Sequence, residues 1–335
     1  MSIKRTLEKA LPLSWYNNLR MCRYNLTSRK TFLEAEKEIN KLYSKKCGKN
    51  IDWNNPLSYT EKINYSKLYG ANNVKSQLTD KVAVRSWIKE KIGEEYLIPL
   101  LGVYDSFKEI PFEELPQQFV IKCNHDSASV NVCDNKDKLD VRKLEKQYDF
   151  FMKRNFAYMT CEMHYKCIPH KIMIEKYMGK AICDYKFLCF DGKPEFCWID
   201  IDRFGNHKRN IYDMNWNLQP FNQMTYGNSE KNIEKPTQFD KMRRVAEILC
   251  QGFDQVRVDL YLINDKVYFG EMTFTNGSGT EVITPQEWDK KLGELWKLDI
   301  TMRDKVYGKD KIRLKDYQVS VSYTHLRAHE TRGNL

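Results

Sequence analysis

The sequence predicts an α+β fold in which helices come first and an antiparallel sheet follows. Residues 1–50 read as helices rich in Lys, Arg and Tyr, and residues 79–93 place apolar side chains at helical spacing. Strand patterns then crowd together at 184–190, 194–203 and 209–213. Runs of strands that follow runs of helices are typical of an α+β fold rather than of a doubly wound parallel sheet.

Composition narrows the class of protein. The 335 residues are 41% hydrophobic and 13% aromatic, so a packed core is expected, and no apolar run is long enough to span a membrane. The ten cysteines form no C-x-x-C pair, which predicts reduced thiols in a cytosolic protein rather than zinc ligands or disulfides. The net charge of +10 suits a phosphate-rich ligand, an acidic polysaccharide or an anionic membrane face. No nucleic-acid-binding motif accompanies that charge, so no nucleic acid partner is expected.

The N-terminal part, 1–78, is predicted to be a helical region. Its first residues, MSIKRTLEKALPLSWYNNL, form either an ordinary surface helix or an amphipathic helix that touches a membrane. A loop is expected at Asn54-Asn55-Pro56, after which Ser58 or Thr60 caps the next helix.

The middle of the chain alternates helix and strand. The helix 79–93 ends at Gly93, and residues 118–123 form a strand that enters the polar loop NHDSASVNVCDN. A helix is expected at 139–155, followed by an apolar strand at 171–178.

The later part is dominated by hairpins. Asp191-Gly192 and Asn264-Asp265 are tight-turn signals, and the second joins strands 255–263 and 266–274. Helices are expected at 237–252 and 285–299. The stretch 319–335 changes composition abruptly and is interpreted as a non-native tail without a role in chemistry.

The hairpin around Asn264-Asp265 carries two acidic residues near one end. Positions whose numbers add up to 529 or 530 should face each other, so Asp259 pairs near Tyr268-Gly270 and Glu271 lies one step beyond, which puts both carboxylates at one end of the hairpin. Alternation places Arg257, Asp259 and Tyr261 on one face, and Phe269, Glu271 and Thr273 on one face. Two inward carboxylates are costly unless a cation joins them, so Mg²⁺ is the natural partner; a salt-bridged hairpin in solvent is the alternative.

Three other segments hold candidate residues with weaker signals. The loop after Lys122 contains Ser127 and Ser129, which could donate to phosphate, although an ordinary polar loop has the same pattern. Strand 171–178 ends in Glu-Lys, which could serve an adenine edge or be a plain strand exit. Asp184 and Lys186 share a strand face and could simply pair.

In this order, the segments between 79 and 280 resemble the ATP-grasp superfamily, which includes D-alanine–D-alanine ligase, biotin carboxylase and glutathione synthetase. A narrower likeness covers about residues 30–300. It is to the teichuronopeptide-biosynthesis-like ATP-grasp proteins of bacterial surface polysaccharide clusters. The motifs that carry it are N-P-x-S-Y-x-E-K-I at 55–63, D-K-x-x-V-R at 80–85, K-C-N-H at 122–125, D-Y-K at 184–186, R-V-D-L-Y at 257–261 and P-Q-E-W-D-K-K-L-G at 285–293.

The resemblance implies an ATP-grasp fold, two α+β lobes that grip ATP, with ATP and Mg²⁺ as cofactors. The implied parts are an N-terminal core portion at 79–118, a lid lobe at 119–178 and a C-terminal lobe with the metal site at 179–305. The implied ATP-binding residues are Lys81, Lys122, Ser127, Ser129, Glu175, Lys176, Met178, Asp184 and Lys186. The implied metal ligands are Asp259, Glu271 and Thr273, and the implied catalytic residues are Arg257, Lys122 and Arg203.

The implied activity is that of a carboxylate–amine ligase acting through an acyl phosphate in capsule or cell-surface polysaccharide synthesis. Its substrates would be a small-molecule or polysaccharide carboxylate and an amine. The loop 123–131 is expected to close over the phosphates. The implied location is the cytoplasm, with association at the inner face of the membrane left open and the oligomeric state unspecified.

Two residues depart from the family pattern. Thr273 stands where an asparagine ligand is usual, and Asp126 puts a negative charge in the phosphate loop. The alternatives are therefore a non-catalytic nucleotide-binding relative and a polysaccharide glycosyltransferase, for which Asp200-Ile201-Asp202 has the D-x-D form.

Overall fold

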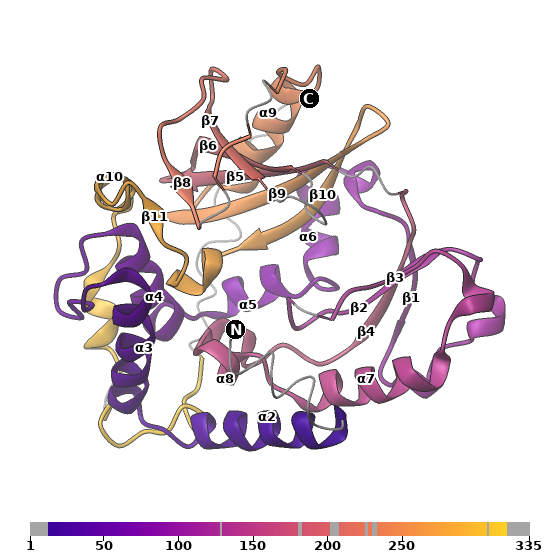
Figure 1. Ribbon diagram of the computed structural model, residues 1–335, viewed down its shortest axis with the longest axis horizontal. Coiled ribbons are helices and arrows are strands. Elements are labelled where there is room, and N and C mark those ends of the chain that lie inside the picture. The colour runs from indigo at the N-terminus through magenta and orange to yellow at the C-terminus, as the bar shows by residue number, and fades with distance from the viewer. Residues whose placement is uncertain are drawn as a thin grey trace.

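The computed structural model describes residues 13–127, 129–179, 183–201, 208–224, 227–229, 233–306 and 308–319. Two antiparallel sheets dominate it, and the N-terminal helices lie beside and below them (Figure 1). The predicted α+β class is confirmed, because helices precede a mainly antiparallel arrangement of strands.

Helices form the first part of the described chain. Two of these helices begin with a capping box, one at Thr31 before α3 and one at Ser58 before α4. Ser58 is one of the two residues that were predicted to cap the helix after the loop at 54–56. The helices are α2 (Leu13–Ser28), α3 (Phe32–Cys47), α4 (Tyr59–Tyr69), α5 (Asn73–Thr79) and α6 (Val84–Lys91).

The predicted single helix at 79–93 is wrong at its start. The helix α5 ends at Thr79 and α6 begins at Val84. Between them, the Asp80 carboxylate accepts hydrogen bonds from the backbone N–H groups of Val82 and Ala83, at 2.8 and 3.2 Å. A side-chain acceptor that satisfies N–H groups locally favours a turn over a continuous helix.

The smaller sheet has the order β1-β4-β2-β3, and α7 (Val141–Lys153) packs against it through Leu144, Tyr148 and Phe151. Its central strands confirm the predicted strands at 118–123 and 171–178. The strands are β1 (Leu100–Tyr104), β2 (Phe119–Cys123), β3 (Asn131–Cys133) and β4 (Ile172–Lys176).

The larger sheet has the order β10-β9-β5-β6-β7, and one of its faces packs on α9 (Phe239–Leu249). Both predicted tight turns are present, with positive φ at Asp191, Gly192, Asn264 and Asp265. The strands are β5 (Cys183–Phe190), β6 (Lys193–Ile201), β7 (Lys208–Asp213), β9 (Gln255–Ile263) and β10 (Lys266–Thr273).

A bulge at Gly270 changes the register of the β9–β10 hairpin. Phe269 faces Leu260, but after the bulge Glu271 faces Asp259 directly and Thr273 faces Arg257. The predicted sharing of a face by Phe269 and Glu271 is therefore wrong, because the extra residue breaks the alternation. Phe269 lies in the core, and the polar residues lie on the other face.

Shorter elements complete the fold. The helix α10 (Glu287–Leu295) is shorter than the predicted 285–299, and Trp296 follows it in the core. Residues near the C-terminal end, including Val319, pack with α3 and α4, whereas the rest of the predicted tail lies outside the described residues. The others are α8 (Ala157–Thr160), β8 (Asn222–Gln223), β11 (Ile283–Thr284) and the 3₁₀ turns Glu94–Tyr96, Phe107–Glu109, Phe112–Glu114, Lys136–Lys138, Met163–Tyr165, Asn276–Gly279 and Ile300–Arg303.

Two absences concern only the described part of the chain. None of its helices is long and apolar enough to cross a bilayer. Its ten cysteines carry free thiols, and six of these are buried: Cys123, Cys133, Cys161, Cys189, Cys197 and Cys250.

Candidate functional site

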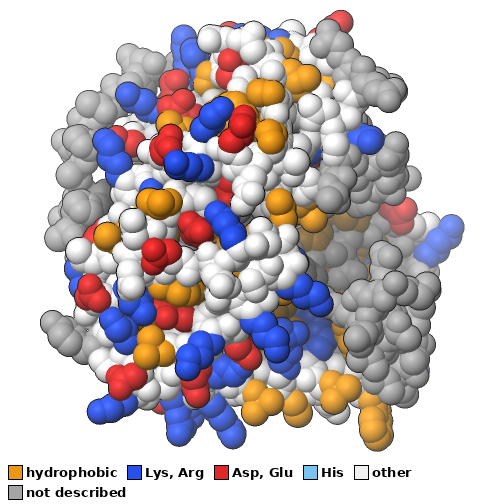
Figure 2. All heavy atoms as spheres, turned by 60° about the vertical axis from the view of Figure 1, so that its left-hand side comes forward, with side chains coloured by type: hydrophobic (Ala, Val, Ile, Leu, Met, Phe, Trp, Pro, Cys, Tyr) orange, Lys and Arg blue, Asp and Glu red, His pale blue; other side chains and the backbone are white. Residues whose placement is uncertain are grey.

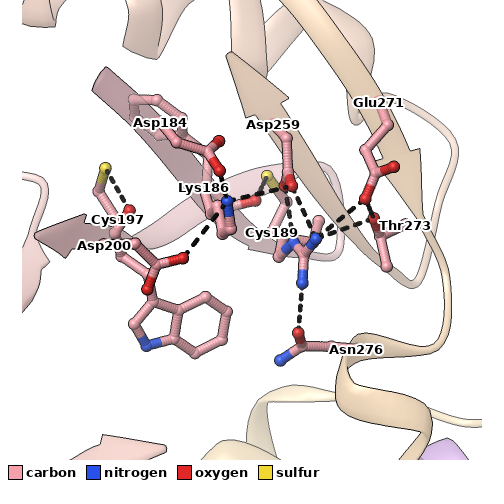
Figure 3. A network of polar contacts seen from close by, with 12 residues as sticks. Asp184, Lys186, Cys189, Cys197, Asp200, Asp259, Glu271, Thr273 and Asn276 are labelled. Atoms are coloured by element: carbon pink, nitrogen blue, oxygen red, sulfur yellow. Dashed lines mark hydrogen bonds and ion pairs between the residues drawn. The ribbon is translucent and has the colours of Figure 1, made fainter. Parts of the chain in front are cut away.

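A polar patch lies on the face of the larger sheet that points away from α9 (Figure 3). Strand pairing arranges the residues of this patch in rows, because residues paired across neighbouring strands project their side chains from the same face of the sheet. One row joins Lys186, Asp259 and Glu271 across β5, β9 and β10, and the next joins Arg257 and Thr273. We call these five residues the hairpin cluster.

Arg257 is the centre of the hairpin cluster. Its Nε and Nη2 atoms contact the two carboxylate oxygens of Asp259 at 2.6 and 2.7 Å. Nη2 also lies 3.2 Å from Glu271 Oε1 and 3.1 Å from Thr273 Oγ1, and the threonine hydroxyl donates to Glu271 at 2.8 Å. One guanidinium therefore holds two carboxylates and a hydroxyl in one place.

Lys186 joins the hairpin cluster to a second acidic group. Its ammonium pairs with Asp184 and lies 3.6 Å from Asp200 and 3.7 Å from Asp259. Asp200 in turn accepts from Arg209 Nε at 2.6 Å. Asp200 is thus held inside the sheet by two cations, and its D-x-D partner at 202 lies outside the described residues.

The pKa values of the two hairpin carboxylates, Asp259 and Glu271, are shifted in opposite directions. Burial raises the pKa of Asp259, and Arg257 and Lys186 offset only part of that effect. Burial would also raise the pKa of Glu271, but Lys81 and Arg257 bring it below its ordinary value. Glu271 is therefore anionic at neutral pH and lies in the field of Lys81, which comes from the other side of the site.

Asn276 is a site residue that the sequence reasoning missed. Its side-chain oxygen accepts from Arg257 Nη1 at 2.5 Å, and its amide nitrogen donates to Gln223 at 3.0 Å. The turn that carries it is held by α4, where Asn64 donates to the Gly279 carbonyl and Lys67 to the Ser278 carbonyl. The signal was present in the sequence as Asn-Gly-Ser-Gly directly after the strand.

Lys122 and Glu175 meet on neighbouring strands of the smaller sheet. Lys122 Nζ lies 2.6 Å from Glu175 Oε2, and Arg85 Nη1 lies 3.4 Å from the other oxygen. The Glu175 carboxylate thus joins two cations, Lys122 and Arg85, that come from two other predicted motifs. Beyond them, Lys176 is exposed and Met178 is half-buried, so both predicted adenine contacts lie at the strand exit.

A hollow of about 660 Å³ borders this strand exit. Arg85 lines it from α6, Leu100 lines it from β1 of the smaller sheet, and Tyr268 lines it from β10. It therefore lies where the two sheets approach each other, next to the residues predicted to hold adenine.

Lys81 is placed between the two sheets. Its ammonium donates to the backbone carbonyl of Asp126. Burial lowers the pKa of Lys81, and the charges of Glu271 and Asp126 offset part of that change. Lys81 is therefore a partly desolvated cation in the field of Glu271 and Asp126.

Buried polar contacts hold the loop after Lys122. The Asp126 carboxylate forms a buried ion pair with Arg154 at 2.5 Å, and Ser129 donates its hydroxyl hydrogen to the same carboxylate. Ser129 also accepts from the backbone of Cys123 at 2.8 Å. The Ser129 hydroxyl hydrogen is therefore bound to Asp126 in this structure, whereas Ser127 is exposed.

Buried contacts also hold the start of this loop. The Asn124 side chain donates to Asp80 and to the Pro169 carbonyl, each at 2.8 Å. The His125 ring stacks on His170 with centroids 3.8 Å apart, and its Nε2 lies 3.1 Å from the Phe151 carbonyl. Cys123, His125 and Asp126 lie close enough to form a metal-ligand group, but these contacts already use the histidine and the aspartate. The predicted closing motion of 123–131 is thus restrained at its first half.

The sequence of the chain shows its family. A sequence model described as TupA-like ATPgrasp matches residues 61–297. The chain belongs to the TupA-like ATP-grasp family. This match confirms the resemblance to the ATP-grasp proteins, and it confirms the ATP-grasp fold. Membership of this family supports ATP-dependent ligation in general. None of the curated proteins compared matches the chain.

Solved structures are similar to the chain only at a distance. D-alanine–D-alanine ligase from Bacillus anthracis is 18% identical, with a TM-score of 0.39 over 61% of this chain and 59% of that enzyme. D-alanyl-alanine synthetase A from Vibrio cholerae is 9% identical, with a TM-score of 0.39 over 73% and 65%. The ATP-grasp ligase PsnB, solved with a precursor variant, Mg and ADP, is 10% identical, with a TM-score of 0.36 over 60% and 52%. The family assignment rests on the sequence match.

Most of the predicted residues of this TupA-like ATP-grasp chain fall into three groups. The structure brings Lys186, Arg257, Asp259, Glu271 and Thr273 into one cluster, with Asp184 attached through Lys186. It places Lys81, Lys122 and Glu175 on the opposing side, where Lys81 acts on Glu271. Arg203, a predicted catalytic residue, lies outside the described residues.

Proposed function

We propose that the chain is an ATP-dependent carboxylate–amine ligase that acts through an acyl phosphate in capsule or cell-surface polysaccharide synthesis. The observation that carries the proposal is the pairing of Asp259 with Glu271 around Arg257, opposite Lys81. Family membership supplies the class of reaction, and the hairpin cluster supplies residues that suit it.

The residues fit Mg²⁺. Asp259 and Glu271 face each other across the ladder, and Thr273 and Asn276 add neutral oxygens within the same network. A set made only of oxygen donors is what a hard divalent cation prefers. Bound there by Asp259 and Glu271, the ion would disperse negative charge on the phosphates of ATP.

Cations of the chain bind the transferring phosphoryl group. Lys81 and Lys122 lie on one side, and Arg257 lies on the other. Arg257 now neutralises Asp259, so it must exchange at least one of these contacts to reach a phosphate. Phosphoryl transfer depends mainly on positioning and charge stabilisation, and these three residues supply both.

The proposed reaction has two steps. A carboxylate oxygen of the substrate attacks the γ-phosphorus of ATP, the bond to the bridging oxygen breaks, and ADP leaves. An amine nitrogen then attacks the acyl carbon, inorganic phosphate leaves, and the nitrogen loses a proton. Residues that cover the site must keep water away from the acyl phosphate between these steps.

The proposed substrates are a carboxylate of a uronic acid, free or within a surface polymer, and the amine of an amino acid. The net charge of +10 favours approach of an acidic polymer. We propose that Arg203 binds either the acceptor or the carboxylate and that the reaction takes place in the cytoplasm, where ATP is available.

The test is ADP release, screened with uronate polymers and amino acids in the presence of Mg²⁺. We expect ADP and an amide product with the wild-type chain. Asp259→Asn and Glu271→Gln should each lower the rate by about 10²–10³-fold, as expected when one preorganised charge contact is removed. Asp265→Asn, the same change at the far end of the same hairpin, is the matched control and should leave the rate unchanged.

Two results would contradict the proposal. Transfer of sugar from a UDP-sugar without ADP release would identify a glycosyltransferase. Equal function of wild type, Asp259→Asn and Glu271→Gln in a capsule-forming cell would identify a binding protein that retains the fold.

A further inference from the structure

Helix α2 presents an apolar stripe to solvent. Trp15, Leu19 and Leu26 are 67%, 54% and 62% exposed, and Cys22 between them is exposed as well. At about 100° per residue, these four side chains fall within an arc of roughly 60°. Hydrophobic side chains gather along the lower edge of the face in Figure 2, at the level where α2 lies in Figure 1.

The opposite side of α2 fixes the helix to the protein. Tyr16 and Tyr24 are buried, and Tyr24 joins the core of the smaller sheet with Met21 beside it. Arg20 lies over the rings of Tyr16 and Phe150, at 5.6 and 4.8 Å from their centroids. The exposed stripe is therefore a permanent feature of a docked helix and not the core face of a helix that has come loose.

Charge favours one kind of occupant. Within Leu13–Ser28 the helix has no Asp or Glu, and the exposed cations Arg23 and Arg29 flank the stripe. A tryptophan and leucines on one line with arginines at the sides are the pattern of a helix that lies in a bilayer interface with anionic headgroups. At 16 residues the helix is about 24 Å long, which suits lying in the plane of the interface.

We propose that α2 docks the chain onto the surface of an anionic membrane through Trp15, Leu19, Cys22 and Leu26, with Arg23 and Arg29 on lipid headgroups. The stripe enters the headgroup boundary while the rest of the chain stays in water. This interaction is independent of the ligase reaction and is measured by binding alone.

The test is flotation of the full chain with vesicles of phosphatidylcholine alone or of phosphatidylcholine with phosphatidylglycerol. Wild type should float with the anionic vesicles and remain behind with the neutral ones. A Leu19→Glu, Leu26→Glu variant should lose about tenfold or more of the bound fraction, because two charges then enter the apolar boundary. The matched control is Leu42→Glu, Leu295→Glu, two leucines 44% and 39% exposed on other helices, and it should float like wild type.

Each remaining outcome decides against the proposal. Equal flotation of wild type and the Leu19→Glu, Leu26→Glu variant would show that α2 is not the contact. No flotation of wild type, together with a change from dimer to monomer in that variant, would assign the stripe to a second copy. No flotation with an unchanged oligomeric state would assign the stripe to a segment of this chain. Circular dichroism and the thermal midpoint, unchanged between the two variants, show that folding does not cause the difference.

Discussion

Two buried aspartate–arginine pairs in this molecule look alike in local geometry and differ in what surrounds them. Asp126 meets Arg154 at 2.5 Å, and Asp259 meets Arg257 at 2.6 Å. Both aspartates are almost inaccessible to solvent. Both also come from segments that the sequence placed near ATP, the loop after Lys122 and the β9–β10 hairpin.

The difference lies in how completely each pair is satisfied. Asp126 receives Arg154 and the Ser129 hydroxyl, and Arg154 also stacks over Phe151 at 4.5 Å from the ring centroid. Around Asp259, two cations are shared among several carboxylates, so the negative charge is not fully matched. A matched pair in the core is structural, whereas a cluster with surplus oxygen donors on a sheet face is suited to take up a cation.

The largest effect is expected at Arg257. Arg257→Lys should lower kcat for ADP release by about 10³-fold, or about 4 kcal/mol, because an ammonium cannot reproduce the forked contacts. The free energy of unfolding should change far less, and urea unfolding beside steady-state kinetics measures both. If the loss of stability accounted for all the lost activity, Arg257 would have a structural role like that of Arg154, and the prediction would be wrong.

At the Asp126–Arg154 pair, a substitution should change the free energy of unfolding. Asp126→Asn leaves the Arg154 charge buried without its partner and should reduce the free energy of unfolding by about 3–5 kcal/mol. The exposed pair of Asp105 with Lys171 is the control, and Asp105→Asn should cost less than about 1 kcal/mol. Equal costs for the two variants in urea unfolding would mean that burial does not set the value of the pair.

Acid should weaken the region of the Asp126 loop. Burial, with His170 next to it, lowers the pKa of His125 to about 4, below the ordinary value near 6.5. The unfolded chain therefore binds more protons between these values, so stability falls as pH falls from about 6.5 towards 4, by up to about 1.4 kcal/mol per pH unit. His125→Asn should flatten this slope in unfolding measured across pH 5–7, and an unchanged slope would contradict the assignment.

The smallest effect is expected at Thr273. Thr273→Asn replaces a hydroxyl with a stronger neutral oxygen ligand and should lower the Mg²⁺ concentration for half-maximal ADP release by less than about tenfold. Weaker dependence on Mg²⁺ in Thr273→Val than in wild type would contradict a ligand role. A rise in the Mg²⁺ requirement of Asn276→Ala would point to Asn276 as the neutral ligand instead.

The hairpins were predictable because their turns and alternation are local. Asp191-Gly192 and Asn264-Asp265 demand positive φ, and the second turn fixes which residues face each other near it. Spacing in the sequence therefore brought Asp259 to within one step of Glu271, and the bulge makes the two residues face each other directly. The family motifs also predicted the order of the lysines along the chain.

The rest depends on contacts between distant segments. No local pattern reveals that Arg154 lies under the loop and neutralises Asp126, since 28 residues separate them. The same holds for Glu175, which pairs with Lys122 and Arg85. The break between α5 and α6 was missed because helical spacing continues across it, while the Asp80 side chain decides the turn.

The bulge at Gly270 makes the hairpin sensitive to the length of the chain rather than to its chemistry. If Gly270 were paired in the ladder, or if one residue were inserted after it, Glu271 would move to the row of Val258 and enter the apolar core beneath α9. Any side chain at position 270 would also crowd the Asp259 carbonyl, which lies 2.9 Å from where its Cβ would sit. A one-residue insertion here would therefore abolish the cluster while every one of its residues remained in the sequence, so the spacing between the two acidic residues matters as much as the residues themselves.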